Sequence, residues 1–220
     1  KGRRLVWGGA ASELQSALQA AVEEKPQSFL AGENTEWQGM WAGSDESGKG
    51  DFFGPLVVAA VIVDETTAAK LQAAGVKDCK QLSDKKVLLL EEVIKENVVD
   101  SAVLELKPHI YNMRYNQVKA EGDNLNQLLG YGHVAALSQV LERHQACKGA
   151  LIDQFTQSKA VLNSLRAKFP AMTFKQQPKA ESDLAVAAAS VLARAKFLRS
   201  MKELALMAGE EELPKGGGEL

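Results

Sequence analysis

The sequence has few cysteines, no long hydrophobic run and almost no net charge. Two cysteines among 220 residues, Cys79 and Cys147, are too few for a disulfide scaffold or a cysteine-rich zinc site. The longest apolar run, Leu56–Val63, falls far short of the roughly 20 residues that a membrane-spanning helix needs. No long apolar stretch follows the basic first residues, so we expect no secretory signal. We therefore expect a cytoplasmic protein without a membrane segment.

The charge balance excludes a strongly basic protein. The chain has 26 lysine and arginine residues against 28 acids, a formal net charge of −2 and a pI of about 6.0. Domains that bind nucleic acids are usually basic, so charge alone argues against that class. Hydrophobic residues make up 45% and charged residues 25% of the chain, which is typical of a globular protein rather than a disordered one.

Apolar patterning predicts an α/β domain that begins near Gly39. Strands that alternate with helices favour a sheet covered by helices. The predicted strands are Met40–Ser44, Leu56–Val63, Val98–Leu106, Ala150–Asp153 and Met172–Lys175. The predicted helices run from Ser83 to about Glu96, from Asn124 to His144 and from Ser182 towards Met207, and Tyr111–Tyr115 is expected in a loop or short helix.

Four acidic residues lie beside these predicted elements. Asp45 and Glu46 follow the first strand, Asp153 ends a later strand, and Glu181 precedes the last helix. Ligands of open α/β sheets collect at strand ends. Four carboxylates there would suit Mg²⁺ or Mn²⁺, and two such ions ~3.5–4 Å apart could support phosphodiester hydrolysis. The alternative is that each acid is a solvated or helix-capping residue, which is the usual role of an isolated carboxylate.

A glycine-rich segment follows the acidic pair. Gly48-Lys49-Gly50 would let the backbone approach a sugar or phosphate, with positive charge from Lys49. The segment lacks the order of a P-loop, and an ordinary hairpin turn is the alternative. The three histidines lack metal-ligand spacing, and His133 is expected on the packed face of a helix. Basic residues of the last helix could contact phosphates or form a solvated face: Arg194, Lys196 and Arg199.

Five segments, in the same order, resemble the bacterial type 2 ribonucleases H, and ribonuclease HIII most of all. The resemblance covers about residues 39–215. Asp51-Phe52-Phe53 after the Gly-Lys-Gly segment, and a glutamate as the fourth acid, favour ribonuclease HIII over ribonuclease HII. The segments are 43–56 (GSDESGKGDFFGPL), 78–83 (DCKQLS), 124–129 (NLNQLL), 152–155 (IDQF) and 179–194 (KAESDLAVAAASVLAR).

The resemblance implies a ribonuclease H-like α/β fold, a mixed β-sheet flanked by helices. It also implies an endoribonuclease that hydrolyses the RNA strand of RNA/DNA hybrids and leaves 5′-phosphate and 3′-hydroxyl ends. The catalytic residues, which would bind two Mg²⁺ or Mn²⁺ ions, would be Asp45, Glu46, Asp153 and Glu181. The residues that bind substrate would be Gly48, Lys49 and Gly50, at the ribose 2′-OH, and Lys80, at a phosphate. We expect a monomer whose partner is the hybrid.

One departure and two alternatives leave this interpretation open. The spacing from Glu181 to the alanine run is one residue shorter than in the family, so Asp183 is a rival for the fourth position. The first alternative is cleavage at single ribonucleotides in duplex DNA, as in ribonuclease HII. The second is a non-catalytic fragment that binds hybrids.

The resemblance also predicts two domains. Residues 1–38 resemble the last strand and helix of a substrate-binding domain similar to the TATA-box-binding protein, followed by a linker. Residues 39–220 would be the catalytic domain, short at its C-terminus, so we expect a fragment. Without the four catalytic acids, 26 basic residues face 24 acids, a charge of +2. Two divalent ions would cancel those four acids, so the metal-bound form would be mildly cationic.

Overall fold

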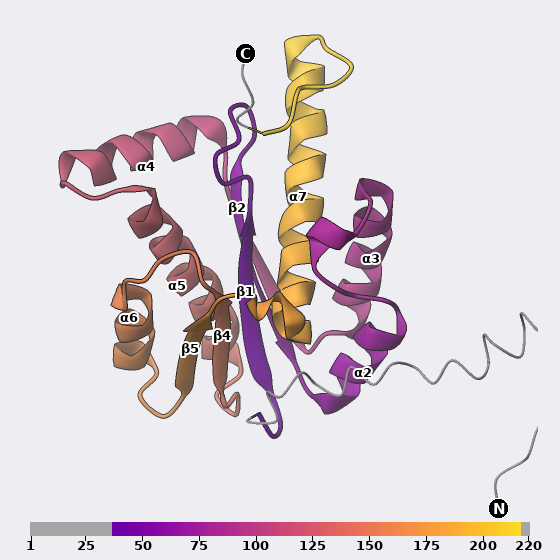
Figure 1. Cartoon of the computed structure of the whole chain (residues 1–220), viewed down its shortest axis with the longest axis vertical. Helices are drawn as coiled ribbons and strands as arrows, with labels where there is room; N and C mark the ends of the chain where they lie inside the picture. Colours follow the sequence, from indigo (N-terminus) through magenta and orange to yellow (C-terminus); the bar gives the residue numbers. More distant parts are fainter. Residues whose placement is uncertain (1–36, 217–220) are drawn as a thin grey trace, which may run out of the picture. The chain divides into compact units, whose positions relative to one another are not determined.

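The computed structural model describes residues 37–216. The segment expected to form a partial N-terminal domain lies outside these residues, apart from the last part of its linker. Among the described residues, five strands form one sheet in the order β3-β2-β1-β4-β5 (Figure 1). β1 pairs antiparallel with β2 and parallel with β4, so the sheet is mixed as predicted. The strands are β1 Trp41–Ser47, β2 Leu56–Val63, β3 Asp100–Leu106, β4 Gly149–Asp153 and β5 Thr173–Gln177.

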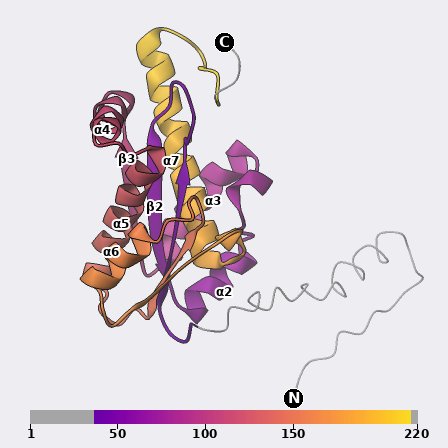
Figure 2. The same cartoon turned by 60° about the vertical axis from the view of Figure 1, so that its left-hand side comes forward.

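Helices cover both faces of this sheet (Figures 1 and 2). One face packs on α7 with α2 and α3, and the other on α5 with α4 and α6. Their bounds are α2 Glu65–Ala73, α3 Asp84–Asn97, α4 Pro108–Ala120, α5 Leu125–Arg143, α6 Ala160–Lys168 and α7 Leu184–Ala208, and two short 3₁₀ helices are η1 Cys79–Gln81 and η2 Ala180–Ser182.

The side chains of β2 show how the two layers form. Val57, Ala59 and Val61 pack in the cluster that contains α7, whereas Val58 and Ala60 pack in the cluster that contains α5. All eight residues of β2 are buried. A central strand covered on both faces has no solvent side, which explains its continuous apolar sequence.

Side-chain caps define where several helices begin. Ser83 caps α3 by accepting a hydrogen bond from the backbone N–H of Lys86, and Asn124 caps α5 in the same way, as the sequence predicted. The predicted start of α7 at Ser182 is wrong, because Ser182 belongs to η2 and Asp183 caps α7. Asp183 accepts hydrogen bonds from the backbone N–H groups of Ala185 and Val186.

Three helices were missed or underestimated. α2 and α6 were not predicted, and the segment around Tyr111–Tyr115 is part of the 13-residue helix α4. α4 buries only Val118, and α6 has no side-chain cap at Lys159, so neither has a strong signal in the sequence. Over residues 37–216, no helix is both long and apolar enough to cross a membrane.

Candidate active site

Two aspartates lie side by side where β1 and β4 end. β1 and β4 are parallel, and Ser44 pairs with Ile152, so Asp45 and Asp153 occupy the next positions on strands ~4.8 Å apart. The prediction that Asp45 and Glu46 follow the first strand is wrong. Both residues lie within β1, where they pair with Ala59 and Val58 of β2. This extension of β1 fixes both acids on a rigid element.

The side chains of these aspartates lie on the face of the sheet that packs on α7. Leu151, two residues before Asp153, packs against Ala180 and Val186, and residues two apart in a strand share a face. Asp153 Oδ1 also accepts a hydrogen bond of 3.1 Å from the backbone N–H of Ala180. This contact holds η2, which contains Glu181, against the end of β4.

Lys80, on η1, lies in the electrostatic field of these acids. Burial acts to lower the pKa of Lys80, but the charges of Asp78, Asp45, Glu181 and Asp153 outweigh it and raise this pKa. The structure therefore brings Lys80 to the same site as the three acids from β1, β4 and η2. A lysine among several carboxylates partly balances their charge.

Asp45 is the most strongly perturbed of the acids. It is 7% exposed, and burial is the largest of the effects that raise its pKa well above the usual range. The charges of Glu46 and Asp153 raise it further, against a hydrogen bond from the backbone N–H of Glu46 and the charge of Lys80. Desolvation and like charge together make this a place where a cation would be strongly stabilised.

Glu46 approaches the site from the other face of β1, where α5 packs. Its Oε2 lies 3.1 Å from Nε2 of His133, a fully buried residue of α5. Burial acts to raise the pKa of Glu46, but the hydrogen bond and charge of His133, with the charges of Lys49 and Lys80, lower it below the usual value. His133 is thus more than a packing residue, which the sequence analysis missed.

The acids do not form a closed metal cage. Within residues 37–216, no three aspartate, glutamate, histidine or cysteine side chains are close enough together to hold a metal ion. The donor chemistry nevertheless fits, because carboxylate oxygens are the ligands that Mg²⁺ and Mn²⁺ prefer. Burial first, and then the charges of Glu46 and Asp153, raise the pKa of Asp45, and a bound cation would offset both effects.

Asp183, the rival for the fourth position, is engaged elsewhere. Its carboxylate caps α7 and also accepts hydrogen bonds from the indole N–H of Trp41, with Nε1 3.2 and 3.0 Å from the two oxygens. Burial raises its pKa despite these bonds. The structure therefore gives Asp183 a role in starting α7, while Glu181, in η2, is the acid in the field of Lys80.

The Gly-Lys-Gly segment forms a turn beside Glu46. Gly48 and Gly50 have φ angles of 84° and 76°, which favour glycine, and the backbone N–H of Asp51 donates to the Gly48 carbonyl. A Cβ atom at Gly48 would lie 2.0 Å from the carbonyl oxygen of Pro55, whereas one at Gly50 would meet nothing within 4 Å. Lys49 is exposed on this turn.

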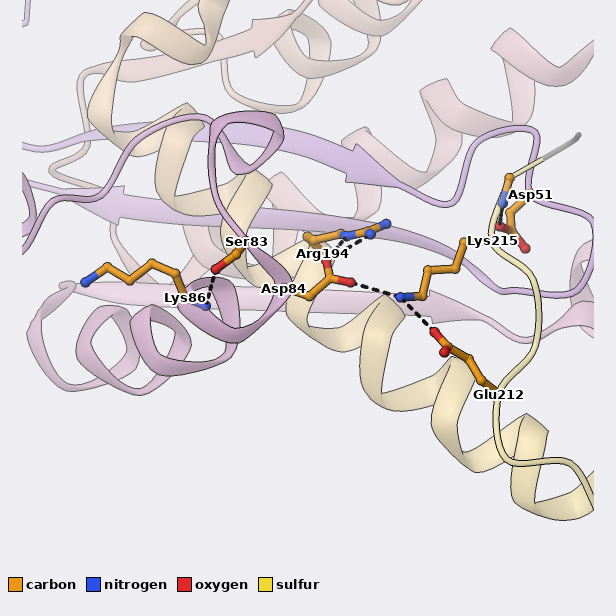
Figure 3. A network of polar contacts seen from close by, with 8 residues as sticks. Asp51, Ser83, Asp84, Lys86, Arg194, Glu212 and Lys215 are labelled. Atoms are coloured by element: carbon orange, nitrogen blue, oxygen red, sulfur yellow. Dashed lines mark hydrogen bonds and ion pairs between the residues drawn. The ribbon is translucent and has the colours of Figure 1, made fainter.

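A polar network holds the rest of this loop in place (Figure 3). Asp51 Oδ1 accepts hydrogen bonds from the backbone N–H groups of Phe53 and Gly54, and its Oδ2 accepts one from Gly216. Lys215 pairs with Asp84, at the start of α3, at 2.9 Å. The segment after α7 thus folds back onto the loop that follows Gly-Lys-Gly.

Basic residues of α7 are occupied by ion pairs within the protein. Arg194 pairs with the same Asp84, and Arg199 pairs with Glu91 of α3 (Figure 3 shows Arg194). Lys196 pairs with Glu105 of β3 at 3.0 Å. These pairs support a structural interpretation of this part of α7.

The sequence and the fold of this chain are similar to those of known proteins. The Ribonuclease HII family model matches residues 42–219. Ribonuclease HIII of Protochlamydia amoebophila (strain UWE25) is 42% identical over 174 residues, which are 79% of this chain and 56% of that protein. The crystal structure of Bst-RNase HIII in complex with Mn²⁺ has a TM-score of 0.71 at 34% identity, over 88% of this chain and 62% of that chain. The crystal structure of Aquifex aeolicus RNase H3 has a TM-score of 0.68 at 32% identity, over 81% and 64%.

This chain therefore spans little more than half the length of the relative from Protochlamydia. The match to solved structures confirms the ribonuclease H-like fold, and the identities confirm the resemblance to ribonuclease HIII. The mixed sheet flanked by helices agrees with the matched family model. The chain belongs to the ribonuclease HII family.

Proposed function

We propose that this chain is a metal-dependent endoribonuclease that hydrolyses the RNA strand of RNA/DNA hybrids and leaves 5′-phosphate and 3′-hydroxyl ends. One observation carries the proposal: Asp45 and Asp153 extend from neighbouring parallel strands onto one face, with Glu181 held nearby through Ala180. The match to proteins named Ribonuclease HIII supports the same substrate.

Divalent ions are the cofactor that these residues fit. Asp45, Glu46, Asp153 and Glu181 would hold two Mg²⁺ or Mn²⁺ ions, which when bound would stabilise the charge that develops in phosphodiester hydrolysis. The structure of Bst-RNase HIII contains Mn²⁺. Asp45 and Asp153 lie on rigid strands, so they would present oxygens without a large loss of conformational entropy.

The substrate would approach across the Gly-Lys-Gly turn. The exposed backbone and ammonium group of Lys49 would contact the ribose, and its 2′-OH is the group that distinguishes RNA from DNA. Lys80 would contact a phosphate and also stabilise the ionised acids around it. Repulsion between the acidic site and the phosphates would be relieved only when the ions are bound, which favours a metal-loaded form as the active species. We take this form to be a monomer.

Replacement of Asp153 by asparagine tests this proposal. With Mg²⁺ or Mn²⁺, the wild-type chain should cut the RNA strand of a labelled hybrid, and Asp153→Asn should lose at least about 100-fold in rate, because losses of 10–100-fold are typical even of groups outside the metal's own ligands. Asp100→Asn is the matched control, since Asp100 pairs with Ile62 near the opposite end of β2 and should leave cleavage unchanged.

The choice of substrate separates the proposal from its alternatives. A continuous hybrid should be cut faster than a DNA duplex that contains one ribonucleotide; the reverse order would favour an activity like that of ribonuclease HII. Binding of the hybrid without cleavage in either metal would instead favour a non-catalytic module. Equal cleavage by the wild type and Asp153→Asn would contradict the assignment of the acids.

A further inference from the structure

A buried histidine connects the interior of the sheet to the acidic site. His133, in the middle of α5, is fully buried, and both ring nitrogens have partners. Nδ1 lies 2.5 Å from the Oγ of Ser44, and Nε2 lies 3.1 Å from the Oε2 of Glu46. Ser44 and Glu46 are two residues apart in β1, so they share the face that packs on α5.

The helix approaches the sheet closely at this point. A Cβ atom at Gly132 would lie 2.8 Å from Cγ2 of Val58 in β2, so the lack of a side chain at Gly132 brings α5 near the strands. The ring of His133 also stacks on Phe155, with ring centroids 4.8 Å apart and an interplanar angle of 8°. Phe155 lies two residues after Asp153. The imidazole is therefore fixed from three sides.

The donor in each hydrogen bond follows from the chemistry of the partners. A glutamate side chain is ordinarily ionised near neutral pH, and an ionised carboxylate can only accept hydrogen bonds. Nε2 of His133 must therefore carry the hydrogen. In a neutral ring, Nδ1 would then accept the hydroxyl hydrogen of Ser44. Each hydrogen bond in the series Ser44–His133–Glu46 thus has one donor and one acceptor. Oε1 of Glu46 takes no part in the contact with His133.

We propose that His133 is a positioning residue for Glu46: with Ser44 behind it and Phe155 against its ring, it sets the direction in which this carboxylate faces the acidic site. The inference rests on the proposed function, because the carboxylate that it orients is one of the proposed metal ligands. A hydrogen bond to a ligating carboxylate fixes its orientation, and loss of such a partner typically costs 10–100-fold in metal affinity or activity.

Three variants separate positioning from general support of the fold. His133→Phe keeps a ring to stack on Phe155 but removes both hydrogen bonds. His133→Gln retains an amide N–H that can donate to Glu46. Ser138→Ala is the control, because Ser138 is also a buried polar residue of α5 but its Oγ has no hydrogen-bond partner in the structure.

The primary measurement is Mn²⁺ binding without substrate, by electron paramagnetic resonance and calorimetry. His133→Phe should weaken Mn²⁺ binding by about 10–100-fold, His133→Gln should restore a part of it, and Ser138→Ala should match the wild type. In cleavage of the hybrid, kcat of His133→Phe should fall by a similar factor, while KM should change by less than about 2-fold. The reason is that Glu46 would hold a metal ion and would not contact most of the substrate.

A second measurement needs no variant. Long-range ¹H–¹⁵N spectra of the metal-free wild type should show a hydrogen on Nε2 of His133. A neutral ring with its hydrogen on Nδ1 would overturn the proposal, and so would unchanged Mn²⁺ affinity in folded His133→Phe. If the wild type binds Mn²⁺ but cuts no hybrid, the proposed function fails, while the Mn²⁺ and tautomer results still decide the role of His133.

Discussion

The identity of the fourth acid of the site can be tested by substitutions at two positions, Asp183 and Glu181, which should have opposite effects on stability and on cleavage. Asp183 caps α7 and accepts the indole N–H of Trp41, whereas Glu181 lies in η2 near Lys80. Loss of an N-cap costs about 1 kcal/mol, and loss of an acceptor for a partly buried N–H costs about 1 kcal/mol more. Asp183→Ala should therefore lower the free energy of unfolding by about 2 kcal/mol, and Tm by about 4–8 °C.

Urea unfolding and hybrid cleavage at 25 °C measure the two effects. Asp183→Asn should retain most of the stability, because asparagine caps helices about as well as aspartate, and both Asp183 variants should cut the hybrid at nearly the wild-type rate while folded. Glu181→Gln should change the free energy of unfolding by less than about 0.5 kcal/mol but reduce cleavage at least about 100-fold. Loss of cleavage in Asp183→Asn, with cleavage retained in Glu181→Gln, would refute this assignment.

Three further variants test the electrostatics of the site and the geometry of the turn. Burial and the charges of Glu46 and Asp153 raise the pKa of Asp45 in the folded chain, so its favourable contribution to stability exists only at low pH and is lost as the pH rises through the raised pKa. In chelator at pH 7, Asp45→Asn should therefore melt above the wild type, by a margin that shrinks towards pH 4, although it should cut no hybrid. A Tm below that of the wild type would contradict the cost assigned to burying this carboxylate beside other acids. Gly48→Ala should lower the free energy of unfolding by well over the ~1–2 kcal/mol that a left-handed backbone costs, because its methyl group would meet the Pro55 carbonyl. Gly50→Ala should show only that backbone cost, because a methyl group there would meet nothing. Equal urea midpoints for the two variants would show that the turn is not held as described.

Local signals explain why much of the fold could be predicted. The continuous apolar run of β2 and the capping residues Ser83 and Asn124 determine their elements through neighbours in the sequence. α2 and α6 have only nine residues each, and such short helices depend on packing against the rest of the domain. A local sequence pattern does not predict that packing. β1 extends past Ser44 because β2 supplies partners for Asp45 and Glu46, which strand propensity disfavours.

In the site, too, some features could be predicted from the sequence and others could not. The acids could be found from their positions beside the predicted elements and from the family resemblance, although only Asp153 ends a strand. The contact of His133 with Ser44 and Glu46 joins residues 89 and 87 positions apart, so no local pattern predicts it. The nearest signal was Gly132, next to His133 in α5, because a glycine there allows the helix to approach β2 closely. Contacts with Trp41 and with the start of α7 distinguish Asp183 from Glu181, and no local pattern predicts the contact with Trp41.

The central claim is that the acidic end of β1 and β4 supports metal-dependent cleavage of RNA in a hybrid. Its most direct test is incubation of the chain with an RNA/DNA hybrid, labelled on the RNA strand, in Mg²⁺, in Mn²⁺ and in a chelator in parallel. We expect RNA fragments with 5′-phosphate and 3′-hydroxyl ends in at least one metal, and none in the chelator. Cleavage that persists in the chelator, or an intact RNA strand in both metals with folded protein, would contradict it.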